Sequence, residues 1–223
     1  MSTLLMRNIS ALASILVLSA PSGGALGQTG RGTPGQPEGA SLLPPDPAEL
    51  GSILAYEGYA LAAAPFITDQ VCPSGTACVF GSAGGVGLGL QRRWPSGIGV
   101  GLGYEVWFVD SNGVYELGVM HTLQASIRYT LTKAWRAQPF LNGAIGVMAL
   151  GDTIRFAAIG PSIDLRVGVE IELTQAIALM LAIPCRFFST GSFVTPRDRV
   201  SRADDFGGNA TIGFLAGLVI LDP

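Results

Sequence analysis

Apolar and polar residues alternate along several stretches of the chain with a period of two. In "IDLRVGVEIEL" (163–173) every odd position is apolar, and the even positions carry Asp164, Arg166, Gly168, Glu170 and Glu172. The segments "GIGVGLGYEVWFV" (97–109) and "LGVMHTLQASIRYTL" (117–131) alternate in the same way. Because successive side chains of a β-strand point to opposite faces, each stretch predicts a strand with one apolar and one polar face.

The same pattern, extended along the chain, predicts about eight strands, at 51–63, 81–94, 97–109, 117–131, 135–149, 162–174, 176–188 and 208–221. Each is long enough to cross a bilayer at the usual tilt. The connections are short at 95–97, 132–134 and 174–175, and longer at 64–80, 110–116, 150–161 and 189–207. This layout predicts an all-β, antiparallel up-and-down transmembrane β-barrel with both termini in the periplasm.

Alternation alone also fits a soluble barrel with the two faces reversed, so composition has to decide between them. The polar face is mostly Gly, Ser, Thr and Asn, only 13% of all residues are charged, and Lys133 is the one lysine. The mean hydropathy is +0.45. Such a face is a poor water-solvated exterior, so we expect the apolar face to meet lipid. Trp94 and Trp135, at strand ends on the short-turn side, are expected at headgroup level.

The N-terminal segment predicts export. Arg7 precedes an apolar run, "ISALASILVLSA" (9–20), and small residues follow at 25–27, so residues 1–27 are predicted to be a cleaved signal peptide. Residues 28–48 are rich in Gly and Pro and predict a disordered lead-in. The barrel domain is expected over 49–223. After the signal no uncharged apolar run of about twenty residues occurs, which disfavours a helical membrane protein.

Residues 51–221 resemble the small eight-stranded outer-membrane barrels of the OmpA, OmpX and OmpW type. The resemblance is one of architecture, carried by "GIGVGLGYEVWFV", "TLQASIRYTL" and "IDLRVGVEIEL". It implies a monomer that the barrel-assembly machinery inserts into the outer membrane of a diderm bacterium, among its lipid and lipopolysaccharide. Such barrels usually carry a terminal aromatic residue, whereas this sequence has Leu221-Asp222-Pro223 at that place.

The lumen of such a barrel would hold the charged residues of the polar face. The predicted network comprises Glu57, Glu105, Arg128, Asp164, Arg166, Glu170, Glu172 and Arg186. A wall nearly without side chains is expected from Gly85, Gly87, Gly89, Gly99, Gly101 and Gly103. Eight strands enclose a space only just filled by side chains, so these charges must pair. A fully paired network would plug a structural membrane protein, the favoured interpretation; a partly solvated network would form a narrow pore for ions or small solutes.

Cysteine and histidine offer little chemistry. Cys72 and Cys78, six residues apart, are disulfide candidates in an oxidising envelope. Some small barrels modify lipids with a histidine and a serine two residues on, but here His121 is followed by Leu123 at that position, and the hydroxyl of Thr122 is expected to point inward. We therefore expect no catalytic residues, no metal, no cofactor and no enzymatic activity; a lipid-modifying enzyme is the less favoured alternative.

The long loops carry the remaining hypothesis. Loop 189–207 and the segment 150–161 contribute four arginines as candidates for binding an extracellular ligand, a surface or lipopolysaccharide phosphates: Arg155, Arg197, Arg199 and Arg202. The net charge of -3 gives no basic surface for nucleic acid. The sequence therefore favours a structural or surface-interacting barrel.

Overall fold

The computed structural model describes residues 51–68, 71–131, 136–152, 155–195, 197–203 and 208–222. The predicted signal peptide (1–27), the lead-in (28–48) and Trp135 lie outside these residues. The regular secondary structure of the described residues consists of strands. No helix among them is long and apolar enough to cross a membrane.

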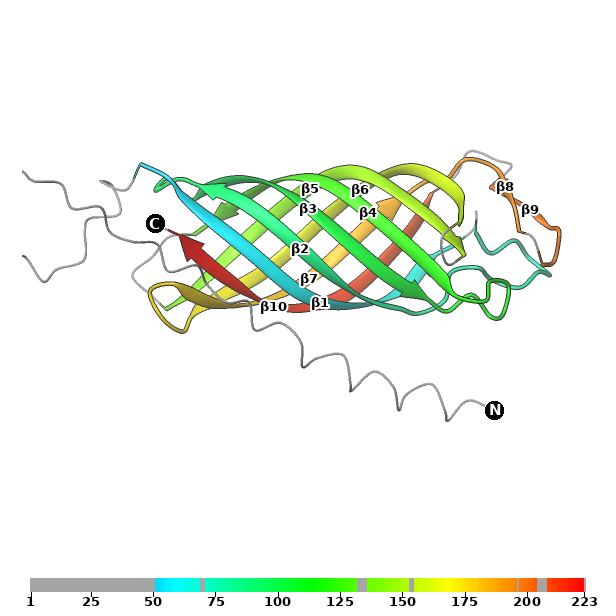
Figure 1. The fold of residues 1–223 in the computed structure, drawn as a ribbon, viewed down its shortest axis with the longest axis horizontal. Helices are drawn as coiled ribbons and strands as arrows, with labels where there is room; N and C mark the ends of the chain where they lie inside the picture. Colours follow the sequence, from blue (N-terminus) through cyan, green and yellow to red (C-terminus); the bar gives the residue numbers. More distant parts are fainter. Residues whose placement is uncertain are drawn as a thin grey trace, which may run out of the picture. The chain divides into compact units, whose positions relative to one another are not determined.

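Eight strands close into one antiparallel barrel (Figure 1). They are β1 (Ile53–Ile67), β2 (Ala83–Arg93), β3 (Ile98–Val109), β4 (Gly118–Thr130), β5 (Ala137–Asp152), β6 (Arg155–Glu172), β7 (Ile177–Phe188) and β10 (Asn209–Asp222). Consecutive barrel strands are neighbours, and β1 closes the ring by pairing with β10. Two short strands, β8 (Phe193–Val194) and β9 (Ser201–Arg202), pair with each other between β7 and β10. The predicted all-β up-and-down barrel is confirmed.

The outward face of the barrel is apolar. Leu102 on β3, Ile127 on β4 and Ile145 on β5 are 62%, 61% and 68% exposed, whereas the charged residues Glu105 and Arg128 of the same strands are buried. The pairing of β3 with β4 keeps both strands in phase, so their apolar positions share one side. An apolar exterior around buried charged residues is the reverse of a water-soluble protein and matches a lipid-facing surface.

Aromatic side chains gather near both ends of this apolar surface. Trp94, Tyr56 and Tyr129 are exposed at the end with the short turns. At the end with the long loops the exposed rings are Phe66, Phe108, Phe156 and Phe187. Amphipathic and aromatic rings favour the boundary between lipid and water, so the two groups bracket the region that lipid would cover.

The β5–β6 hairpin differs from the prediction. The sequence predicts a long loop over 150–161, whereas β5 continues to Asp152 and β6 begins at Arg155. Gly160 falls within the predicted loop, yet it pairs with Met148, and a Cβ added to it would lie 1.7 Å from the Ser189 carbonyl oxygen. The glycine therefore permits a close backbone approach inside a strand and does not mark a turn.

The inward glycines of β2 and β3, here called the glycine wall, are covered by side chains of neighbouring strands. These glycines are Gly85, Gly87, Gly89, Gly99, Gly101 and Gly103. A Cβ added to Gly87 would lie 2.2 Å from Cε2 of Tyr59, and one added to Gly89 would lie 3.0 Å from Oε2 of Glu57. Both neighbours come from β1, which pairs with β2. Gly87 and Gly89 thus provide room for the large inward side chains of Tyr59 and Glu57, and here the wall is not an open face of the lumen.

The long loops pack into an apolar cap, here called the loop cap and formed by the buried residues Val71, Val79, Phe80, Val114, Tyr115 and Phe193. The ring centroid of Phe80 lies 5.4 Å from that of Phe188, at the end of β7. Cys72 and Cys78 are joined by a disulfide in the first of these loops. The cap therefore continues the apolar interior of the barrel beyond the ends of its strands.

The packing of Tyr59 over Gly87 gives a first prediction. Gly87→Ala places a methyl group within the Tyr59 ring, so we expect the free energy of unfolding to fall by about 1–3 kcal/mol, the usual range for overpacking. Gly58→Ala is the matched control, because its added Cβ meets only Leu88, at 4.0 Å on the outward face. Urea unfolding in lipid vesicles measures both; equal loss of stability in the two variants would refute this role of the glycine wall.

Candidate functional site

The lumen contains a first cluster of ion pairs near the short-turn end, formed by Glu57, Arg93, Arg128 and Glu170. Arg93 Nη2 lies 3.0 Å from Glu57 Oε1, and Arg93 Nη1 lies 2.7 Å from Glu170 Oε2. Arg128 Nη1 lies 2.9 Å from Glu57 Oε1 and also pairs with Glu170. The four residues come from β1, β2, β4 and β6, so the cluster crosses the lumen.

A second cluster lies farther toward the loops and contains Glu105, Asp164, Arg166 and Arg186. Arg166 Nη2 lies 2.6 Å from Glu105 Oε1, and Arg186 Nη2 lies 2.5 Å from Glu105 Oε2. Arg166 Nε donates to Asp164 at 3.0 Å, and Arg186 also pairs with Asp164. All four residues are buried. The acids and the arginines thus alternate around a closed ring of contacts.

Glu105 is the centre of the second cluster and is 0% exposed. Besides the two arginines, three neutral groups donate to its carboxylate: Tyr59 Oη at 2.8 Å, Trp107 Nε1 at 3.0 Å and Gln124 Nε2 at 3.2 Å. The guanidinium of Arg186 also stacks over the Trp107 ring, 4.9 Å from its centroid. Full satisfaction of both oxygens is what makes an ionised carboxylate tolerable without water.

Each cluster is neutral. The first contains two guanidinium and two carboxylate groups, and so does the second. In a narrow lumen an unpaired charge would lose its hydration without compensation, which costs several kcal/mol per ion. The composition of each cluster therefore cancels charge where it is buried.

The structure brings together all the residues predicted for the lumen network except Glu172. Its side chain is exposed near the short-turn end, where it accepts a hydrogen bond from Gln138. That prediction was wrong because the inward phase of β6 continues to the end of the strand, beyond the enclosed part of the lumen. Arg93 takes part instead, and the sequence carried a signal for it: Arg93 shares the inward phase of Gly85, Gly87 and Gly89 on β2.

Three buried polar atoms near these clusters have no hydrogen-bond partner among the described residues. They are Arg128 Nε and Gln124 Oε1 on β4 and Asn142 Oδ1 on β5. Arg128 and Asn142 face each other across the β4–β5 pairing. Unpaired polar atoms of this kind commonly form hydrogen bonds with buried water. The β4–β5 wall is therefore the part of the lumen whose polar atoms are available to bind water.

Arg202 belongs to the loop cap and not to an exposed binding surface. It is 1% exposed, donates to the Ala77 carbonyl oxygen at 2.9 Å, and pairs with Asp198 at 2.5 Å. This corrects its prediction as a surface-binding residue, because its charge is used to tie two loops together. The hydrogen bond from Arg202 holds the pKa of Asp198 below its usual range, and burial raises the pKa of Tyr115 to about 12.

The other arginine candidates are exposed. Arg197 donates to the Gly113 carbonyl oxygen at 2.7 Å and so links the last loop to the loop between β3 and β4. Arg199 and Arg155 are exposed in the last loop and at the start of β6. No group of three or more His, Cys, Asp or Glu residues that could hold a metal occurs in the described ranges. His121 lies on the outward face, separate from both ion-pair clusters.

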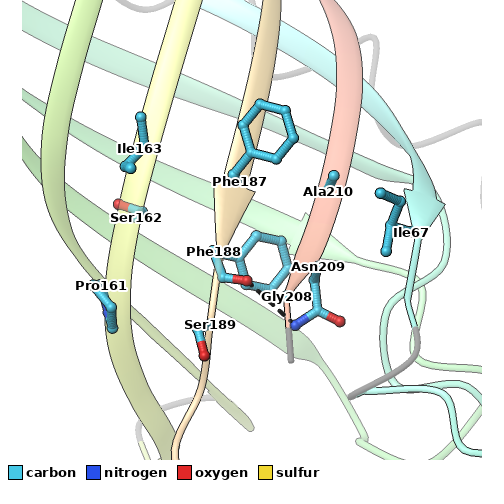
Figure 2. A pocket seen from close by; sticks show the side chains of 10 residues that line it. All are labelled: Ile67, Pro161, Ser162, Ile163, Phe187, Phe188, Ser189, Gly208, Asn209 and Ala210. Atoms are coloured by element: carbon cyan, nitrogen blue, oxygen red, sulfur yellow. Dashed lines mark hydrogen bonds between the residues drawn. The ribbon is translucent and has the colours of Figure 1, made fainter. Parts of the chain in front are cut away.

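An apolar hollow of about 490 Å³ lies at the loop end of β6, β7 and β10 (Figure 2). It is lined by Ile67, Pro161, Ser162, Ile163, Phe187, Phe188, Ser189, Gly208, Asn209 and Ala210. A second hollow is lined by Ser52, Leu54, Arg92 and Asp222 at the short-turn end. Neither is lined by a residue of the two ion-pair clusters.

Comparisons with known proteins identify the fold. No family model matches the chain, and no curated protein does. The crystal structure of Neisserial surface protein A (NspA) is 13% identical, with 76% of this chain and 98% of that one covered and a TM-score of 0.53. The N-terminal barrel of OprF from Pseudomonas aeruginosa is 11% identical (74% and 96% covered, TM-score 0.41), and OprG from the same organism is 12% identical (77% and 93%, 0.39). The similarity to NspA, together with the closed eight-stranded topology, shows that the chain has the fold of the small outer-membrane barrels.

The central position of Glu105 gives a second prediction. Glu105→Gln leaves Arg166 and Arg186 with one carboxylate in a buried site, so we expect a loss of about 3–5 kcal/mol in the free energy of unfolding. Glu172→Gln makes the same chemical change at an exposed site, and we expect an effect within about 0.5 kcal/mol. Urea unfolding of both folded variants in vesicles tests the difference. A Glu105→Gln barrel as stable as the control would contradict a neutralising role for this carboxylate.

Proposed function

We propose that this protein is a non-conducting, non-enzymatic barrel of the outer membrane of a diderm bacterium, with a structural or surface-interaction role. The observation that carries the proposal is the pair of neutral ion-pair clusters across the lumen. Guanidinium and carboxylate groups fixed by several partners each cannot reorient around a passing ion without losing those contacts. The charged lumen then acts as a plug.

The apolar exterior and the aromatic side chains near both of its ends support the membrane location. In this arrangement the short turns and both barrel termini face the periplasm, and the loop cap faces outward. The protein is inserted as a monomer by the barrel-assembly machinery after export and cleavage of the signal peptide. Its surroundings are outer-membrane lipid and lipopolysaccharide, and it binds no nucleic acid.

The loop cap supports the surface-interaction role. Arg202 links the last loop to the first, and Arg197 links it to the second. Loops tied together in this way present a fixed surface. Such a surface loses little conformational entropy when a partner binds. In the last loop Arg197 and Arg199 are the exposed arginine candidates, and Arg155 lies exposed at the neighbouring hairpin. An extracellular ligand would bind here.

A narrow pore is the second candidate function. Its support is the β4–β5 wall, where Arg128 Nε, Gln124 Oε1 and Asn142 Oδ1 have no protein partner among the described residues. A chain of water along this wall would be the path. The apolar loop cap opposes it, because the buried residues Val79 and Phe80 lie beyond the strand ends where such a path would have to emerge.

Ion conductance across a planar bilayer tests the proposal. We expect the refolded barrel to give no discrete current steps, because both clusters and the loop cap obstruct the lumen. Folding is verified first by the change in gel mobility on boiling. Arg166→Ser removes a lumen charge, and Arg155→Ser is its matched control outside the lumen. Steps in the wild type that change with Arg166→Ser but not with Arg155→Ser would overturn the plug and establish the pore.

A further inference from the structure

The lipid-facing surface contains one unusual residue. Between the two rims, the outward positions of the described barrel strands are apolar or aromatic apart from the thiol of Cys185 and His121 on β4. His121 is also the only histidine of the chain. An ionisable side chain on such a surface is costly, and it is a candidate functional site whenever a partner for it can be named.

Tyr104 supplies the first contact of His121. The Tyr104 hydroxyl lies 2.7 Å from His121 Nδ1, and the two rings stack with centroids 6.0 Å apart. In an apolar setting the phenol needs an acceptor for its proton, and Nδ1 provides one if the imidazole is protonated at Nε2. The opposite tautomer would leave the Tyr104 O–H without an acceptor. The pair therefore favours an imidazole whose free Nε2–H is a donor.

A β-bulge supplies the second contact. Leu150 pairs with Ala158, but the next residue, Gly151, pairs with Phe156, so Ala157 is an extra residue in β6. The extra residue reverses the alternation of β6, which turns Phe156 to the outside. Phe156 is 57% exposed, and its ring meets that of His121 edge-on with centroids 5.4 Å apart.

The rings meet across β5, where small residues leave room. Ala149 of β5 lies opposite His121 in the register, and Gly151 lies opposite Phe156. Tyr104 from β3 and Phe156 from β6 thus contact the imidazole from two sides, and the small residues of β5 lie beneath it. A bulge that re-aims one side chain onto an otherwise regular surface is typical of a functional position.

The depth of His121 indicates its ligand. From Thr130, at the short-turn end of β4, to His121 the tilted strand climbs roughly 23 Å, close to the height of about 25 Å of the apolar band of such barrels. The imidazole therefore lies at the outer edge of the band, where lipid headgroups begin. Arg155, the residue before Phe156, is exposed there and adds positive charge.

We propose that His121 donates from Nε2 to a phosphate oxygen of an outer-leaflet lipid headgroup, with Tyr104 and Phe156 as positioning residues. A hydrogen bond to an ionised acceptor is the strong kind, and the outer edge of the lipid is where phosphates are found. The inference rests on the proposed membrane location. It is independent of whether the lumen conducts.

Solid-state NMR of the full chain, labelled with ¹⁵N-histidine and refolded in bilayers, tests the site, because the single histidine gives only two ring signals. In phosphatidylcholine bilayers with phosphate-free buffer, ³¹P recoupling should dephase the Nε2 signal and leave Nδ1 nearly unchanged. In bilayers of a phosphorus-free galactolipid with inorganic phosphate in the buffer, the dephasing should be lost. Dephasing that persists there would overturn the assignment to a lipid and indicate free phosphate.

Matched variants identify the positioning role. Tyr104→Phe removes the hydroxyl that selects the tautomer, so the Nε2 dephasing should fall, whereas Tyr129→Phe, an outward tyrosine near the other rim, should leave it unchanged. The heat-dependent gel shift separates two failures. A chain that forms no barrel in any bilayer contradicts the proposed membrane protein itself; a folded wild-type barrel without Nε2 dephasing contradicts only the phosphate site.

Discussion

Charge neutralisation inside a narrow barrel lumen is the constraint on which the rest of the structure depends. Water cannot hydrate Glu105 there, so two arginines and three neutral donors must reach its carboxylate. This requirement explains why long side chains cross from opposite strands and why several inward positions of β2 and β3 are glycine. Gly87 and Gly89 provide the volume that Tyr59 and Glu57 occupy.

The lumen is then filled in two different ways along its length. Polar clusters fill the short-turn end and the middle, and apolar side chains fill the loop end and continue into the loop cap. The cap is held by the Cys72–Cys78 disulfide and by Arg202, whose buried charge is again balanced locally, by Asp198. The exterior is separate from this system, and His121 on the outward face contacts Tyr104 and Phe156 instead of the lumen.

Much of the barrel could be predicted from the sequence, because a period of two identifies the strands and also shows which face of the sheet each side chain occupies. The alternation around Asp164 and Arg166 predicts inward positions, and both side chains are buried in the structure. Pairing across the lumen could not be predicted: Glu57 and Arg128 are 71 residues apart and lie on non-adjacent strands, so their contact depends on the stagger of the whole barrel. For the same reason alternation could not separate Glu172, beyond the enclosed lumen, from Glu170 within it.

The central claim, that the lumen clusters are stabilised by local charge balance, is tested most directly by a double-mutant cycle on Asp164 and Arg186. Asp164→Asn and Arg186→Met each leave a unit charge unbalanced, whereas the double variant is neutral again. Urea unfolding of the folded barrels in vesicles should show the double variant more stable than the sum of the single losses by about 2 kcal/mol. Additivity within about 0.5 kcal/mol would show that the two charges do not depend on each other.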